Sequence, residues 1–258
     1  MEKKVKIIAI ANQKGGVGKT TTAINLAAAL AAKRKKVLLI DSDPQGNSSS
    51  GVGINMKKVR VHLYHAYASG YSAEEVRLSS NIKNLDIIPS SIDLVAAEIE
   101  LIAVENRESQ LKFTIDPIVN QYDYILIDCP PSLGLLTINA LTACDSVLIP
   151  MQCEYFAMEG LAQLVSTIRS VKKSFNKGLF INGLVLTMFD KRNRLTHQVA
   201  AEIKIHFAKQ LFTTVIPRNV RLSECPSHGK SIIDYDKNST GAVAYLNLAK
   251  EFLKRQRD

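Results

Sequence analysis

Short apolar runs alternate with longer helix-patterned segments along most of the chain. Most runs are nearly continuous in hydrophobicity, and that pattern is typical of parallel strands buried on both faces. The runs that predict strands are 5–11, 37–40, 85–88, 124–127, 147–149, 184–188 and 214–216. The stretches that predict helices are 20–33, 93–113, 133–142, 160–173, 195–211 and 241–257. This alternation predicts an α/β fold with one doubly wound, mostly parallel sheet and helices on both faces.

The length of 258 residues suits one large α/β domain. There is no internal repeat and no low-complexity linker, and the polar, glycine-rich stretch 46–53 is short enough to be a loop within one domain. We therefore expect residues 1–258 to form a single domain that starts at its first strand, without an N-terminal helix-turn-helix extension. No apolar stretch approaches the ~20 residues that span a bilayer. The first apolar run is also too short for a secretory signal, so we expect a cytoplasmic protein.

The cysteines give no sign of a metal or disulfide framework. Cys129, Cys144, Cys153 and Cys225 stand alone, without a Cys-x-x-Cys pair. We expect reduced, mostly buried thiols.

A glycine-rich segment with two lysines lies between the first predicted strand and the first predicted helix. Residues 14–21 read Lys-Gly-Gly-Val-Gly-Lys-Thr-Thr, and Gln13 stands where the phosphate-loop pattern G-x-x-x-x-G-K-[ST] has its first glycine. Backbone N–H groups in this setting cradle phosphates. Lys19 would reach the β- and γ-phosphates of ATP, and Thr20 would bind Mg²⁺. The predicted ATP-binding residues of this loop are Lys14, Gly15, Gly16, Val17, Gly18, Lys19, Thr20 and Thr21.

Aspartates follow two of the predicted strands. Asp41 and Asp43 come after strand 37–40, and Asp128 follows strand 124–127. The carboxyl ends of parallel strands line the ligand crevice of such sheets, and carboxylates there hold Mg²⁺, often through water. Asp128 resembles a Walker B acid, Asp43 is placed to orient the attacking water, and Asp41 to support the metal. A lone aspartate at a strand end is more often a helix or turn cap, but three beside one phosphate loop favour the metal site.

The charge is unevenly distributed. Lys and Arg number 33 against 24 Asp and Glu, a net charge of +9, and residues 190–258 carry 13 basic and 7 acidic side chains. A basic C-terminal quarter suggests nucleic acid, phospholipid or an acidic protein as partner. A lysine-rich solvated surface would give the same count, so charge alone leaves these alternatives open.

Lys14 adds a more specific signal. The segment from Lys14 to Thr20 is similar to the KGGxGK[ST] loop of the deviant Walker A ATPases, in which a signature lysine reaches the nucleotide bound by the partner subunit. The resemblance implies ATP-dependent homodimers, with Lys14, Lys19 and Asp43 as catalytic residues.

Within that group, four segments resemble the ParA/Soj chromosome-partition ATPases over nearly the whole chain. They are 12–22, 43–47 (Asp-Pro-Gln-Gly-Asn), 128–132 and 216–224. The second segment favours this family over the septum-site ATPases. One departure is Cys225, where the family usually has alanine. The resemblance implies that Pro217 and Asn219 contact adenine, and that DNA contacts come from Arg192 and Arg221, extended by Arg218, Lys230 and Lys250.

The resemblance also implies a function. An ATP-bound dimer would bind double-stranded DNA without sequence preference, and a ParB-type centromere-binding protein would stimulate the hydrolysis that resets it. We expect ATP and Mg²⁺ as cofactors, a location on the nucleoid and no membrane partner.

Two other classes of protein compete with this interpretation. A septum-site ATPase would bind membranes through an amphipathic C-terminal helix, whereas we expect segment 241–257 to pack on the sheet. An electron-transfer ATPase would hold an iron–sulfur cluster across its dimer. Cys129 and Cys144 lack the glycine-rich surroundings such a cluster needs.

Overall fold

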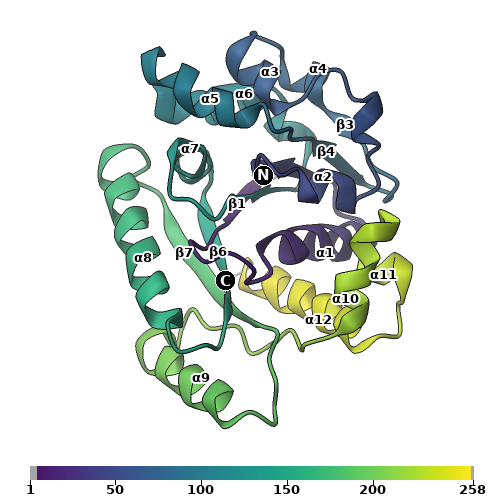
Figure 1. Ribbon diagram of the computed structural model, residues 1–258, viewed down its shortest axis with the longest axis vertical. Helices are drawn as coiled ribbons and strands as arrows, with labels where there is room; N and C mark the ends of the chain where they lie inside the picture. Colours follow the sequence, from purple (N-terminus) through teal and green to yellow (C-terminus); the bar gives the residue numbers. More distant parts are fainter. Residues whose placement is uncertain (1–4, 257–258) are drawn as a thin grey trace.

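A seven-stranded sheet forms the centre of the computed structural model, which describes residues 5–256 (Figure 1). The strand order is β3-β4-β2-β5-β1-β6-β7, and every pairing is parallel except that of β3 with β4. The strands are β1 (Lys6–Ile10), β2 (Val37–Asp41), β3 (Leu78–Ser79), β4 (Leu85–Ile88), β5 (Tyr124–Asp128), β6 (Ser146–Gln152) and β7 (Phe180–Thr187). The predicted doubly wound α/β fold is confirmed. The two-residue strand β3 was missed because it is too short to carry a periodic signal.

Helices cover both faces of the sheet. The α-helices are α1 (Lys19–Ala32), α2 (Asn47–Gly51), α3 (Leu63–Ala68), α4 (Ala73–Val76), α5 (Leu94–Glu100), α6 (Gln110–Ile115), α7 (Leu135–Ala143), α8 (Ala157–Ser174), α9 (Arg194–Phe207), α10 (Val220–Glu224), α11 (Ile232–Tyr235) and α12 (Thr240–Arg255). Helices α1 and α12 lie together on one face, and α7 and α8 lie on the other (Figure 1). The predicted helices other than 93–113 are present, with ends shifted by a few residues.

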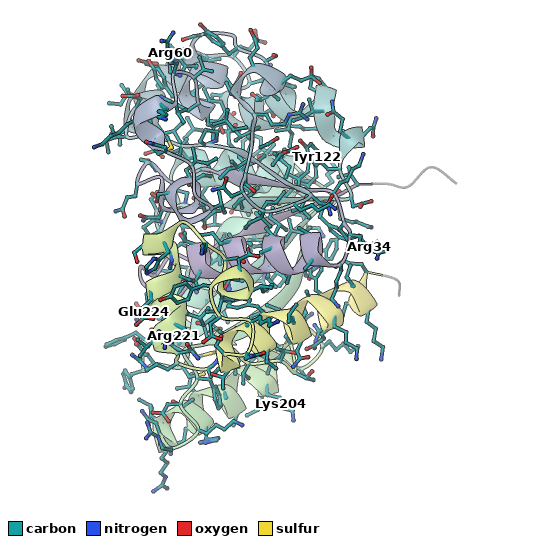
Figure 2. All side chains as sticks on the ribbon, turned by 90° about the vertical axis from the view of Figure 1, so that its right-hand side faces the viewer. Arg34, Arg60, Tyr122, Lys204, Arg221 and Glu224 are labelled. Carbon is teal, nitrogen blue, oxygen red and sulfur yellow. The ribbon has the colours of Figure 1, made fainter. Side chains whose placement is uncertain are left out.

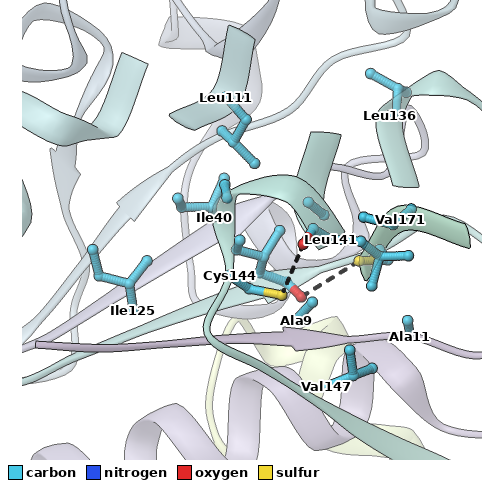
Figure 3. Packing of buried hydrophobic residues seen from close by; sticks show 14 of the residues in the cluster. Ala9, Ala11, Ile40, Leu111, Ile125, Leu136, Leu141, Cys144, Val147 and Val171 are labelled. Carbon is cyan, nitrogen blue, oxygen red and sulfur yellow. Dashed lines mark hydrogen bonds between the residues drawn. The ribbon is translucent and has the colours of Figure 1, made fainter. Parts of the chain in front are cut away.

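Successive residues of each central strand pack into opposite layers. In β2, Leu38 and Ile40 join one hydrophobic cluster, while Val37 and Leu39 join the other. All four are fully buried, which stabilises the fold by about 1.5–3 kcal/mol for each Leu or Ile side chain. Figure 3 shows the first cluster, where residues of the strands meet residues of α6, α7 and α8. Burial on both faces explains why the strand segments are apolar without alternation.

The predicted strand at 214–216 does not form. Isolated bridges join only its flanking residues Leu211 and Pro217 to Leu184 of β7 and to Phe189 just after that strand. Glu251 of α12 accepts hydrogen bonds from the backbone N–H groups of Thr213 (2.8 Å) and Thr214 (2.9 Å). Because these amides donate to a carboxylate, they are not available for hydrogen bonds to a neighbouring strand. The predicted strand at 214–216 was wrong for this reason.

The predicted helix 93–113 is broken in two. Helix α5 and a short 3₁₀ turn end at Ala103, and helix α6 begins at Gln110 after a second 3₁₀ turn. Asn106 has a left-handed φ of 53°, which a continuous helix cannot contain. Asn139 of α7 stabilises the break, since it accepts from the N–H of Leu111 (3.0 Å) and donates to the carbonyl of Arg107 (2.8 Å).

The glycine-rich stretch 46–53 is not a plain loop, because it contains helix α2. Its start is set by Gly46, whose left-handed φ of 66° reverses the chain after β2. The side chains of Ser48 and Ser49 are fully buried against the aspartates of β2 and β5. The short helices α3, α4, α10 and α11 were also missed by sequence analysis.

The cysteines and the C-terminal helix agree with two further expectations. All four cysteines are free and buried, and no group of three or more potential metal ligands from His, Cys, Asp and Glu occurs within residues 5–256. Helix α12 packs on the sheet through Tyr245, Leu248 and Phe252, each at most 1% exposed; residue 257 of the predicted helix lies outside the described residues. In the same part of the chain, no helix is long and apolar enough to cross a membrane.

Candidate active site

A cavity of about 570 Å³ opens beside the loop that joins β1 to α1. Ten of the residues expected at functional sites line it: Gly15, Gly16, Gly18, Lys19, Thr20, Thr21, Asp43, Pro217, Arg218 and Asn219. Gln45, Asn47, Pro131, Thr187, Met188, Ile216, Leu222, Ser223, Pro226 and Tyr245 complete the lining. Of the other residues predicted for the nucleotide or metal site, Lys14, Val17, Asp41 and Asp128 do not line the cavity.

The conformation of the loop requires its glycines. Gly16 and Gly18 have φ values of 75° and 85°, in the left-handed region that favours glycine. Gly18 is the N-cap of α1 and supplies no side-chain cap. Val17 between them is buried, and its carbonyl accepts a hydrogen bond of 2.7 Å from the hydroxyl of Thr187. The loop is thus anchored to β7 with the N-terminus of α1 facing the cavity, which is an arrangement that binds phosphate.

Lys19 lies close to the acids of the site. Its side chain is buried, and its Nζ donates to the backbone carbonyl of Lys14 at 3.1 Å. Burial lowers the pKa of Lys19, while the carboxylates of Asp128 and Asp43 oppose this shift. Among the described residues, the ammonium group hydrogen-bonds to this one neutral acceptor, which the phosphates of a nucleotide can replace.

Asp128 at the end of β5 is fully buried. Its Oδ2 accepts a hydrogen bond of 2.7 Å from Ser48, and its Oδ1 accepts none from the described residues. Burial raises the pKa of Asp128, and the hydroxyls of Ser48 and Thr20 partly oppose the shift. An orphaned carboxylate oxygen beside the Thr20 hydroxyl fits an oxygen-liganded ion such as Mg²⁺.

Asp41 is engaged mainly in holding α2. Its Oδ2 accepts from the backbone N–H (2.7 Å) and the hydroxyl (2.6 Å) of Ser49, and its Oδ1 accepts from the N–H of Asp43 (3.3 Å). Burial and the neighbouring Asp128 carboxylate raise the pKa of Asp41. The geometry thus gives Asp41 the task of positioning α2 and Asp43, and its contact with Mg²⁺ through water stays a prediction.

Asp43 is the acid that reaches the cavity. It is 8% exposed, and its Oδ1 accepts from the N–H of Gln45 at 3.0 Å in a tight turn. Its backbone carbonyl accepts a hydrogen bond from the hydroxyl of Ser90. Hydrogen bonds to the side chain and to the backbone of Asp43 therefore hold its carboxylate at the cavity wall. A group that orients a water molecule needs such a fixed position.

The segment that replaces the predicted strand 214–216 leads into the lining of the cavity. Asn219 is the N-cap of α10, accepting from the N–H of Arg221 at 2.8 Å, and its Nδ2 donates to Thr240 at 2.7 Å. Pro217 lies next to it in the lining. Met188 also lines the cavity with a left-handed φ of 48°, which is strained for a residue other than glycine. Sequence analysis missed Met188 and Tyr245, since no local pattern marks either of them.

Lys14 is directed to its own chain. Its ammonium group forms an ion pair with Glu154, in the loop between β6 and α8, and the Lys14 side chain is 39% exposed. Among the described residues, Glu154 is its only ion-pair partner.

The basic residues expected to contact DNA are all exposed. Arg192 is 91% exposed in its side chain and pairs with Asp190 two positions away. Arg221 on α10 pairs with Glu224, whose label lies next to its own in Figure 2, and more distantly with Asp236. Arg218 lies in the lining of the cavity, while Lys250 lies on α12 beside Lys254. Acidic neighbours therefore offset part of the charge of the two principal arginines.

A glycine loop between β1 and α1, with strand-end aspartates beside it, defines a P-loop ATPase. The model of the family described as "AAA domain" matches residues 5–181. The chain is 56% identical over 246 residues to the sporulation initiation inhibitor protein Soj of Bacillus subtilis, covering 95% of this chain and 97% of that protein. It is 52% identical over 250 residues to the chromosome partitioning protein ParA of Myxococcus xanthus, covering 97% and 88%.

Solved structures agree with this fold. The structure of cobyrinic acid a,c-diamide synthase from Mycobacterium smegmatis with bound ADP and magnesium superposes with a TM-score of 0.86 at 31% identity, covering 98% of this chain and 96% of that one. The chain belongs to the ParA/Soj family of partition ATPases. It is an ATPase, and its cofactors are ATP and Mg²⁺.

Proposed function

We propose that this partition ATPase is a switch that binds DNA as an ATP-bound dimer and releases it after hydrolysis. The observation that carries the proposal is the position of Lys14. Its neighbours Gly15 and Gly16 line the cavity, whereas Lys14 itself does not. A cation of the phosphate loop that does not face its own nucleotide is available for the nucleotide of a second copy.

The proposed chemistry uses the phosphate loop, the strand-end aspartates and the segment that carries Pro217 and Asn219. Lys19 leaves the Lys14 carbonyl and binds the β- and γ-phosphates. Thr20 would hold Mg²⁺, with Asp128 and Asp41 contacting it through water, and the ion would offset phosphate charge. Asp43 orients the attacking water and accepts its proton. Pro217 and Asn219 contact the adenine at the other end.

Dimer closure places Lys14 of each protomer on the phosphates of the other. Closure also joins two weakly basic surfaces into one, and the doubled phosphate contacts tighten DNA binding steeply. Arg192 and Arg221 would supply the main contacts, extended by Arg218, Lys230 and Lys250. Such contacts go to the DNA backbone and carry no base information.

The names of the relatives support a role in chromosome segregation. A ParB-type centromere-binding protein would stimulate hydrolysis, and the switch would act in the cytoplasm on the nucleoid. A septum-site type of membrane attachment is less favoured, because the apolar face of α12 is already buried against the sheet.

Size-exclusion chromatography with light scattering tests the proposal in Mg²⁺ with ADP, with ATP and with ATP plus duplex DNA. We expect a monomer in ADP, a dimer in ATP and a dimer–DNA complex in the third sample. Lys14→Ala should stay monomeric in ATP while it retains nucleotide affinity, and the exposed control Lys83→Ala should behave as wild type. Equal dimer formation by Lys14→Ala and wild type would overturn the role of Lys14 across the dimer.

A further inference from the structure

Residues around Lys14 tie it to the end of β6. The ammonium group of Lys14 pairs with Glu154, and the Lys14 N–H donates to Oδ1 of Asn12 at 3.0 Å. The side chain of Asn12 donates in turn to the carbonyl of Pro150 in β6 at 2.8 Å. Lys14 is therefore fixed through its side chain and its backbone to the same neighbouring strand and the loop that follows it.

A third contact joins the two lysines of the loop. Nζ of Lys19 donates to the carbonyl of Lys14 at 3.1 Å. Lys19 thus contacts the backbone of Lys14, and the side chain of Lys14 contacts Glu154. Glu154 lies 140 positions away from Lys14 in the chain. The proposed function has the ammonium groups of Lys14 and Lys19 bind phosphate. In this structure both groups have partners within their own protomer.

We propose that Glu154 is a latch that holds Lys14 in its own protomer until a second nucleotide-bound copy competes for it. This inference rests on the proposed role of Lys14 across the dimer. An ammonium group paired with Glu154 cannot reach the partner's phosphates at the same time, so closure requires the pair to separate. Glu154 touches no reacting atom in this scheme and is a positioning residue.

Nucleotide binding weakens one side of the latch. The phosphates are charged acceptors, and they attract Lys19 more strongly than a neutral carbonyl does. When Lys19 turns to them, the Lys14 backbone loses one of its contacts. Only a nucleotide-loaded protomer would then release Lys14 readily, and only a partner's nucleotide would attract it.

The exposure of the pair limits the size of the effect. The side chains of Lys14 and Glu154 are 39% and 43% exposed, and water and salt screen such ion pairs. Each latch should therefore change the closure equilibrium by roughly two- to fivefold. A symmetric dimer opens two latches, so the dimerisation constant should change by roughly four- to 25-fold.

The test measures dimerisation by sedimentation velocity in Mg²⁺ and the non-hydrolysable analogue AMPPNP. Glu154→Gln removes the charge and keeps the shape, and it should tighten the dimer roughly four- to 25-fold. Glu154→Asp keeps the charge and should remain close to wild type. Glu159→Gln is the matched control, because Glu159 is an exposed acid on the first turn of α8 with no ion pair among the described residues.

Nucleotide affinity of the monomer separates a latch from a merely structural role. It should be the same in Glu154→Gln and wild type at protein concentrations too low for dimers. Raising the salt concentration should weaken the latch in wild type and reduce the difference between the two proteins. The double variant Lys14→Ala/Glu154→Gln should show no gain over Lys14→Ala.

The outcomes distinguish the latch from the proposed function. If Lys14→Ala forms the AMPPNP dimer normally, the role of Lys14 across the dimer fails, and the latch fails with it. If Lys14→Ala is defective while Glu154→Gln dimerises no better than wild type, only the latch is overturned. Weaker dimers of Glu154→Gln would show that Glu154 acts in the closed dimer instead.

Discussion

The hydroxyl of Ser48 donates a 2.7 Å hydrogen bond to Asp128, joining α2 to the end of β5 across 80 positions of the chain. Ser49, the next residue, binds Asp41 at the end of β2. Helix α2 therefore lies against both buried acids and fixes one oxygen of Asp128. The second oxygen of Asp128 accepts no hydrogen bond that meets ordinary geometry from the described residues, and this leaves the acid able to take part in metal binding.

The two buried acids predict an unusual pH dependence of stability. Burial raises the pKa of Asp41 and of Asp128 above the ordinary value of 3.8. The folded protein then keeps protons that the unfolded chain releases. The contribution of the two aspartates to the free energy of unfolding is therefore greatest below their ordinary pKa. It is lost as the pH rises through their raised pKa values. Each unit of raised pKa corresponds to about 1.4 kcal/mol.

Urea unfolding without nucleotide or Mg²⁺, in buffers from mildly acidic to mildly alkaline, measures this dependence. Asp41→Asn removes one titrating group and should flatten the fall in the free energy of unfolding with rising pH. The same substitution at the exposed Asp116 is the matched control. A wild-type slope in Asp41→Asn would show that Asp41 titrates at its ordinary value.

Lys19→Ala tests the phosphate loop. The variant loses a charged hydrogen-bond donor to the β- and γ-phosphates, an interaction worth about 1.5–3 kcal/mol. ATP affinity, measured by calorimetry, should fall by roughly 10- to 150-fold. Lys58→Ala, at an exposed position outside the cavity, serves as control. Wild-type affinity in Lys19→Ala would contradict the assignment of the loop.

Asp43→Ala should separate binding from hydrolysis. The variant loses the group that orients water, so hydrolysis should slow by about 10²- to 10⁴-fold while ATP binding is retained. The closed dimer should then accumulate in ATP, as seen by light scattering. Should Asp43→Ala hydrolyse ATP at the normal rate, Asp41 would become the candidate for this role.

Charge reversal of the basic residues tests the DNA surface. Arg192→Glu and Arg221→Glu should each weaken binding to unrelated duplexes equally and leave basal ATP hydrolysis unchanged. Each lost phosphate contact should also flatten the salt dependence by about one unit per protomer, roughly two in the dimer.

The measurement for this test is DNA affinity with ATP across a salt series. Arg60→Glu is the control, since Arg60 is exposed and lies far from Arg221 in Figure 2. Unchanged affinity in both variants, with dimers intact, would place the DNA surface elsewhere.

Glu251 should support nucleotide binding from outside the cavity. Its carboxylate accepts from the backbone of Thr213 and Thr214, just before the segment that carries Pro217 and Asn219. Glu251→Ala leaves these amides without their partner, and the protein should lose about 1–3 kcal/mol of stability. ATP affinity should fall more than the rate of hydrolysis at saturating ATP. Lys254→Ala, one turn further along α12, is the matched control, and equal ATP affinity in both would contradict the prediction.

Much of the fold and of the nucleotide site could be predicted from the sequence. Continuous apolar runs predicted six of the seven described strands, because parallel strands buried on both faces need no alternation. The loop at 14–21 was visible because its chemistry is local. Gly16 and Gly18 adopt a backbone conformation that favours glycine, and Lys19 and Thr20 follow directly.

Tertiary structure decided what depends on partners distant in the sequence. Glu251 accepts hydrogen bonds from the backbone N–H groups of Thr213 and Thr214. These groups therefore cannot pair with a neighbouring strand in the way that the apolar run predicted. Asn139 stabilises the break in the segment predicted as one helix. The pairing of Lys14 with Glu154 and the raised pKa values of Asp41 and Asp128 likewise arise from contacts between separate strands and loops. A local pattern encodes which conformations a segment prefers, whereas the electrostatic surroundings of a side chain exist only once the chain has folded.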